Sequence, residues 1–89
     1  MLYNAIMKLC FHYENLAKHG VTPEEAEECF QDSRPLIRRI GDIYWLIAKT
    51  EAGRLLHFGY RKEKNKSYYV FHGMAAREYE HRQYKLRGK

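Results

Sequence analysis

Apolar positions in the first quarter of the chain recur at helical spacing. Between residues 2 and 17 most of them fall three or four apart, and Gly20 then follows as a natural helix stop. The pattern predicts a helix that ends at Gly20. The start of this helix stays open, because Met7 is a second possible initiator after Met1 and residues 8–12 would also suit a short strand.

A second helix is predicted from the residues that begin it. Thr22 can cap the helix, Pro23 suits its first turn, and Glu25 completes a T-x-x-E capping box. The helix is expected to end near Asp32. Three side chains would form its apolar face: Ala26, Cys29 and Phe30.

From residue 36 the pattern changes to short segments rich in β-branched and aromatic residues, separated by turn signals. Strands are predicted near residues 36–40, 42–49, 54–61 and 67–72, with a glycine-containing hairpin turn between the middle two. Within the third strand, side chains alternate between two faces. The predicted core face holds Leu56, Phe58 and Tyr60, and the opposite face holds His57, Gly59 and Arg61.

The last segment, residues 75–87, returns to helical spacing. It would dock on the sheet through Ala76, Tyr79, Gln83 and Leu86. The whole chain, residues 1–89, is therefore expected to form one α+β domain. Its antiparallel sheet would have three to four strands, with two N-terminal helices and one C-terminal helix.

Charge is distributed unevenly along this chain. Residues 1–33 carry six acidic and two basic side chains, whereas residues 34–89 carry fourteen basic and five acidic ones, which gives −4 against +9. A basic segment of this density favours an anionic partner, most of all RNA. The alternative is that the lysines and arginines form an ordinary solvated surface.

Other classes of protein are disfavoured by the sequence. The longest apolar runs are far shorter than the ~20 residues of a membrane-spanning helix, and no secretory signal is recognisable, so the protein is expected to be cytoplasmic. Cys10 and Cys29 are read as ordinary thiols. The histidines and cysteines lack metal-ligand spacing, so neither a metal nor a cofactor is expected.

Several residues have the chemistry that metal-free RNA cleavage requires, namely cations for the phosphate and groups that transfer protons. His57 and Arg61 would share the open sheet face with the basic turn at residues 62–66. On the last helix, Glu80 and Tyr84 lie one turn apart beside a row of Arg77, His81 and Lys85. Alternatively, His57 is an incidental histidine and Arg61 only aids solubility.

Two blocks of sequence resemble the BrnT toxin family. Residues 16–30 read LAKHGVTPEEAEECF and residues 49–56 read KTEAGRLL, close to the family's K-H-G-[VI]-[ST]-x-E-E-A-x-x-x-F and R-T-x-x-G-R-x-L blocks. Glu80 and Tyr84 also match the family's terminal E-x-x-x-Y. The resemblance implies a RelE-like microbial ribonuclease that acts without metal and is neutralised by a ribbon-helix-helix antitoxin.

Two positions depart from that family pattern. His72-Gly73-Met74 stands where the family has S-A-R, and Lys49 replaces an arginine of the hairpin. Lysine keeps the charge but loses the bidentate geometry, and methionine cannot stabilise a phosphorane, whereas His72 could transfer protons. The alternative to a ribonuclease is therefore a module that binds RNA or an antitoxin without cleavage.

The candidate site follows from these considerations. The expected catalytic residues are Arg54, His57, Arg61 and Glu80. The expected RNA-binding residues are Lys49, Lys62, Lys64, Lys66, Arg77 and Tyr84.

Overall fold

The computed structural model describes residues 8–87. A 3₁₀ turn at Lys64–Lys66 joins the last two strands. The other elements, in chain order, are β1 (Lys8–Phe11), α1 (Tyr13–Lys18), α2 (Pro23–Phe30), β2 (Leu36–Ile40), β3 (Ile43–Lys49), β4 (Leu55–Glu63), β5 (Ser67–Ala75) and α3 (Glu78–Leu86).

The strands form one five-stranded mixed sheet in the order β1-β5-β4-β3-β2. Strands β2 to β5 are an antiparallel meander, as the sequence predicts, whereas β1 pairs in parallel with β5. The α+β class is thus confirmed, and the expected sheet of three to four antiparallel strands is wrong. The pairing of the fifth strand is not evident from local sequence patterns, because it joins residues 8–11 to residues 67–70, which lie far apart in the chain.

The predicted first helix is correspondingly wrong over residues 8–12, where the alternative of a short strand is confirmed. Leu9 and Phe11, two residues apart, pack against the hydrophobic core from β1, as side chains on one face of a strand do. The helical part is α1, and Gly20 follows it with a φ of +68°. The part of the prediction on residues 2–7 lies outside the described residues.

Helix α2 begins as predicted. The Thr22 side chain accepts a hydrogen bond from the Glu25 N–H at 3.1 Å, and the Glu25 carboxylate accepts one from the Thr22 N–H, also at 3.1 Å. Its buried residues are the expected Ala26, Cys29 and Phe30. They pack on one face of the sheet against Leu46, Ala48, Leu56, Phe58, Tyr60, Tyr68 and Val70.

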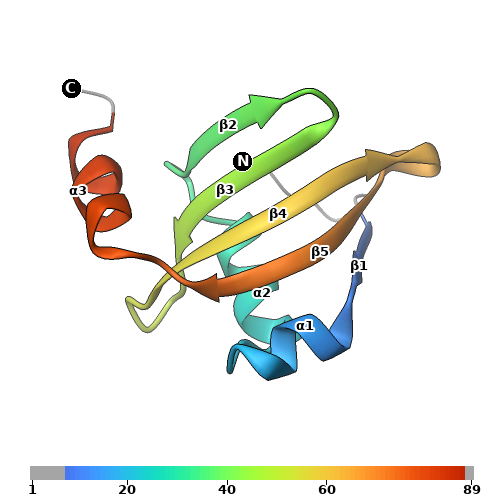
Figure 1. The fold of residues 1–89 in the computed structure, drawn as a ribbon, viewed down its shortest axis with the longest axis horizontal. Coiled ribbons are helices and arrows are strands. Elements are labelled where there is room, and N and C mark those ends of the chain that lie inside the picture. The colour runs from blue at the N-terminus through green and yellow to red at the C-terminus, as the bar shows by residue number, and fades with distance from the viewer. Residues whose placement is uncertain (1–7, 88–89) are drawn as a thin grey trace.

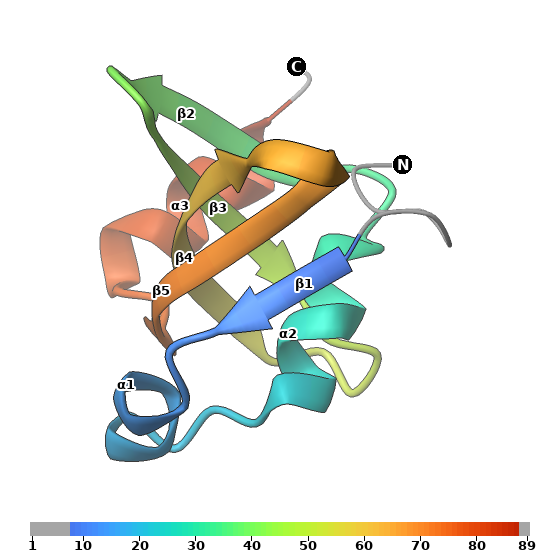
Figure 2. The same ribbon diagram turned by 90° about the vertical axis from the view of Figure 1, so that its right-hand side faces the viewer.

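The two faces of the sheet are covered differently. Helices α1 and α2 lie against one face, and α3 lies at the far end of the other, near β2 and β3 (Figures 1 and 2). We call these the helix-covered face and the open face. No helix within residues 8–87 is long and apolar enough to span a membrane.

The docking predicted for the C-terminal segment is confirmed only in part, because Ala76 packs against the sheet but other predicted residues do not. Tyr84 is buried with Ile47 and Leu55 in a small second core, and Glu80 is also buried. Tyr79 and Leu86, which were expected at the interface, are 45% and 60% exposed. The apolar spacing misleads here because the anchor is a tyrosine, whose hydroxyl donates a hydrogen bond to the Asp32 carboxylate.

Candidate functional site

A histidine–carboxylate pair lies where α3 meets the open face. Glu80 is only 3% exposed, and its Oε2 contacts His57 Nδ1. Its other oxygen accepts a hydrogen bond from the Arg77 N–H at 2.8 Å, which holds the carboxylate in place. The carboxylate therefore orients the imidazole of His57. Within residues 8–87, the buried His57 Nε2 has no hydrogen-bond partner.

A second histidine stands next to this pair. The His72 ring on β5 is centred 6.0 Å from the His57 ring and 5.4 Å from that of His19, which follows α1. Burial lowers the pKa of His72, and the nearby charges of His57, His19 and Arg77 lower it further. His72 therefore favours its neutral form, which is able to accept a proton.

Aromatic rings surround the two histidines. Trp45 on β3 is centred 5.2 Å from His57 and 6.0 Å from Phe71. All four rings are half-buried. An aromatic cluster of this kind on an open sheet face, next to proton-transferring groups, provides surfaces on which planar groups can stack.

Glycine and a β-bulge allow these rings to gather. A Cβ atom added to Gly59 would lie 2.7 Å from Trp45 and 2.9 Å from Phe71, so only glycine leaves room for them. Gly59 pairs with His72 and Tyr60 pairs with Val70, so Phe71 is an extra residue on β5. The bulge thus turns both Phe71 and His72 to the open face.

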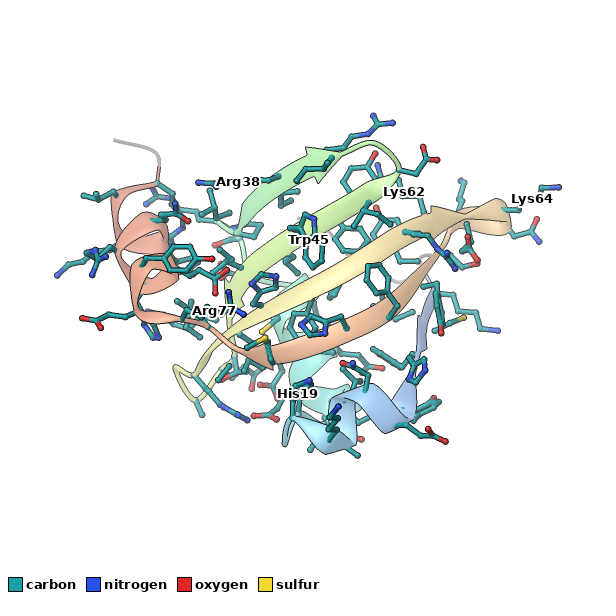
Figure 3. All side chains as sticks on the ribbon, viewed as in Figure 1. His19, Arg38, Trp45, Lys62, Lys64 and Arg77 are labelled. Atoms are coloured by element: carbon teal, nitrogen blue, oxygen red, sulfur yellow. The ribbon has the colours of Figure 1, made fainter. Side chains whose placement is uncertain are left out.

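Several predicted cations border this site. Arg61 and Arg77 are exposed, and the Arg61 guanidinium lies 5.2 Å from the Tyr69 ring centre. Lys64 and Lys66 are exposed on the turn at the far end of β4. Figure 3 shows Arg77 and Lys64 toward opposite ends of the open face, with Trp45 between them. These charges could contact a phosphate backbone across the whole face.

Lys62 is placed differently from its neighbours. Its ammonium lies 4.7 Å from the Tyr44 ring centre and 5.9 Å from that of Tyr68. Both tyrosines belong to the stacked row that packs toward the helix-covered face. The sequence predicts Lys62, Lys64 and Lys66 as one RNA-binding group, but in the structure Lys62 lies apart from the other two.

Arg54 also lies apart from the histidines. Its Nη1 forms an ion pair with Glu25 at 3.0 Å and donates a hydrogen bond to the Gly20 carbonyl, also at 3.0 Å. These contacts tie the β3–β4 turn to the start of α2. Arg54 thus joins elements on the helix-covered side of the molecule, and the structure does not bring it together with His57 and Glu80.

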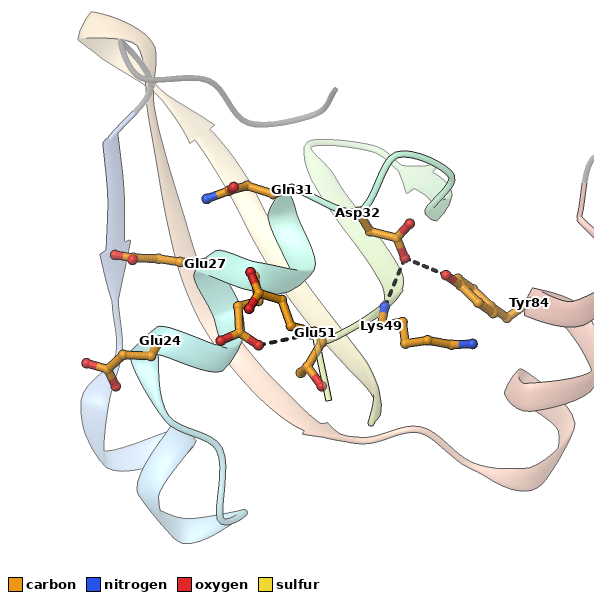
Figure 4. A pocket seen from close by; sticks show the side chains of 9 residues that line it. Glu24, Glu27, Gln31, Asp32, Lys49, Glu51 and Tyr84 are labelled. Carbon is orange, nitrogen blue, oxygen red and sulfur yellow. Dashed lines mark hydrogen bonds between the residues drawn. The ribbon is translucent and has the colours of Figure 1, made fainter. Parts of the chain in front are cut away.

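Lys49 and Tyr84 belong to an acidic pocket of about 580 Å³, seen in Figure 4. The Asp32 carboxylate accepts hydrogen bonds from the Tyr84 hydroxyl and, at 2.9 Å, from the Lys49 N–H. Burial raises the pKa of Tyr84 to about 12, and the bond to Asp32 adds to this shift. These contacts fit an anchor for α3 better than an RNA contact.

Trp45, Phe71 and Arg38 were not singled out from the sequence. Trp45 and Phe71 read as ordinary strand residues, and only the register and the bulge reveal that they share a face with His57. The presence of Gly59 within a β-rich run was an available signal, since such a glycine often marks a close approach. Met74 pairs with His57 across β4 and β5.

No protein-family model matches the chain, and a search of curated proteins finds no relative. The resemblance to BrnT toxins therefore stays a prediction from the quoted motifs. Within residues 8–87, no group of three or more His, Cys, Asp or Glu side chains is arranged to hold a metal ion.

Proposed function

We propose that this protein is a toxin-like, metal-independent endoribonuclease with a RelE-like fold, which works in the cytoplasm as part of a type II toxin–antitoxin system. One observation carries the proposal: the buried Glu80 orients His57 next to a second histidine, His72, on a sheet face bordered by cations. The antitoxin, of the ribbon-helix-helix class, is proposed from the family resemblance alone.

The two histidines supply the proton transfers that RNA cleavage requires. His72, neutral at the outset, accepts the proton of a ribose 2′-hydroxyl. The 2′-oxygen then attacks the adjacent phosphorus, and the bond from phosphorus to the 5′-oxygen breaks. His57 donates a proton to that leaving oxygen. The products are a 2′,3′-cyclic phosphate and a 5′-hydroxyl, and the step consumes no further reactant.

The cations have separate roles in this proposal. Arg77 acts electrostatically on His72 and is exposed, so it is the best placed group to stabilise the charge that develops on the phosphate. Arg61, Lys64 and Lys66 hold the strand farther along the face. The catalytic set is thus revised to His57, His72, Glu80 and Arg77, and Arg54 is left with a structural role.

The alternative is a module that binds RNA or an antitoxin without cleavage. Two observations favour it: Met74 supplies no charge beside His57, and the His57 Nε2 is buried. The substitution Met74→Arg separates the two functions. If the face is catalytic, a guanidinium next to His57 should raise the cleavage rate, because it restores the cation of the resembling family.

The test is cleavage of an end-labelled RNA by the purified protein in the presence of a chelator. Products with 2′,3′-cyclic phosphate ends are expected. His57→Gln and His72→Gln should each lower the rate by about 10²-fold or more, the usual contribution of one proton-transfer group. His81→Gln is the matched control, since His81 is exposed on α3 beyond the histidine pair.

The dependence on pH sharpens this test. Because the pKa of His72 is lowered, the base should stay neutral to a pH below the ordinary histidine value of 6.5, so the acidic limb of the rate profile should lie below that value. RNA binding without cleavage in wild type and in Met74→Arg would support the alternative. The absence of RNA binding at low salt would contradict both the ribonuclease and the RNA-binding module, and would leave only the antitoxin-binding module.

A further inference from the structure

A small cavity of about 150 Å³ opens on the open face between α3 and strands β2 and β3. Its apolar lining consists of Leu36, Ile40, Trp45, Ile47 and Tyr79. Ile40 is 69% exposed and Tyr79 is 45% exposed, so the walls rise from the surface without a covering element in the described chain. Binding pockets for drug-sized ligands usually measure ~300–1,000 Å³. This cavity therefore fits one small planar group.

The polar side chains that line the cavity include Arg38 and Gln83. The guanidinium of arginine offers several donors, and the amide of glutamine offers both a donor and an acceptor. The ion pairs within residues 8–87 engage Arg54, His57 and Arg82, which leaves Arg38 outside them. Figure 3 shows Arg38 on the side of β2 that faces α3. Both groups are thus available to a ligand in the cavity.

The cavity adjoins the proposed catalytic pair. His57 and Glu80 line it directly, and the Trp45 ring lies 5.2 Å from that of His57. A planar group held beside Trp45 would place whatever is attached to it next to the histidines. In RNA, the group attached to a base is the ribose that carries the 2′-hydroxyl.

We propose that this cavity is a nucleobase pocket, which receives one unpaired base of RNA. The base stacks between Trp45 and Tyr79, Arg38 and Gln83 bind its edge, and its ribose lies beside His57. The surrounding cations Arg38, Arg61 and Arg77 favour a polyanion over an apolar or basic partner. The identity of the ligand rests on the proposed function, whereas the pocket can be tested separately.

A nucleobase pocket of this kind requires a single-stranded substrate. In a duplex the bases are stacked on one another, so their faces are closed to an aromatic side chain. A splayed base can instead enter the cavity. Binding at the base also fixes the ribose before the chemical step, which favours cleavage by orientation.

The single tryptophan of the chain is Trp45, so its fluorescence reports on the pocket directly. The probes are a short 2′-O-methyl RNA, which cannot be cleaved through a 2′-hydroxyl, and the same sequence closed into a duplex. The single strand should quench the fluorescence. The duplex, at equal phosphate concentration, should leave it unchanged.

Two pairs of variants test the lining. Tyr79→Ala should weaken binding of the single strand about tenfold, within the range for loss of one base–aromatic contact. Tyr13→Ala is its control, because Tyr13 is 64% exposed on α1 at the other side of the sheet. Arg38→Gln should reduce both affinity and quenching. Arg39→Gln removes the same charge from the next residue of β2, whose guanidinium lies over Tyr44, and should affect only the salt-dependent part of binding.

These experiments distinguish a failure of the nucleobase pocket from a failure of the proposed ribonuclease function. If labelled RNA binds, as measured by anisotropy, but Trp45 is not quenched and Tyr79→Ala equals Tyr13→Ala, the pocket is refuted while the proposed function stands. Equal quenching by the duplex, or by poly-glutamate at the same charge concentration, would also refute the pocket, since binding would then be electrostatic. If no RNA binds even at low salt, the pocket and the proposed function fail together.

Discussion

The two faces of one sheet carry opposite kinds of side chain. On β4, Leu56 and Phe58 are fully buried against α1 and α2, whereas His57, between them, points to the open face with Trp45. The helix-covered face holds apolar and stacked tyrosine side chains. The open face holds histidines and aromatic rings bordered by cations. Outside the small core of Ile47, Leu55 and Tyr84, stability and chemistry are thus separated by the alternation of side chains along a strand.

The comparison predicts that the largest difference in stability between two variants is found for the adjacent residues Phe58 and His57. Phe58→Ala should lower the free energy of unfolding by about 3–5 kcal/mol, since it removes a large ring from a packed core. His57→Gln should change it far less. Urea denaturation checks both values, and a similar loss in the two variants would show that the His57 position contributes as much to stability as the core does.

A smaller effect is expected at Arg54, which the sequence assigned to the catalytic set. Its ion pair with Glu25 is partly exposed, so Arg54→Gln should cost only about 0.5–1 kcal/mol of stability. The affinity of Arg54→Gln for RNA should fall only by the small amount expected for the loss of one positive charge. A tenfold or larger loss of cleavage rate with normal stability would return Arg54 to the active site.

Local signals in the sequence were sufficient for much of the fold. The Thr22–Glu25 capping box begins α2 where the residues predict it, because both hydrogen bonds form within one helical turn. The four-strand meander also follows, since its neighbours in space are neighbours in sequence. Strand β1 could not be predicted with the same certainty, because its partner lies some sixty residues away.

The candidate site was predictable only in part. His57 and Glu80 were both expected, and the structure brings them into direct contact. Their partners depend on features that single strands do not reveal. Phe71 reaches the open face through a bulge, and Trp45 joins it through the register of β3 with β4. Tyr84 has the right chemistry for RNA, but its hydroxyl is occupied by Asp32.

The most direct test of the division between the faces is an NMR titration of the ¹⁵N-labelled protein with uncleavable single-stranded RNA. The largest shifts are expected for the Trp45 indole N–H and for the amides of His57, His72 and Arg77. The amides of α1 and α2 should change little. Shifts concentrated on α1 and α2, with an unaffected Trp45 signal, would contradict the assignment of the open face to RNA.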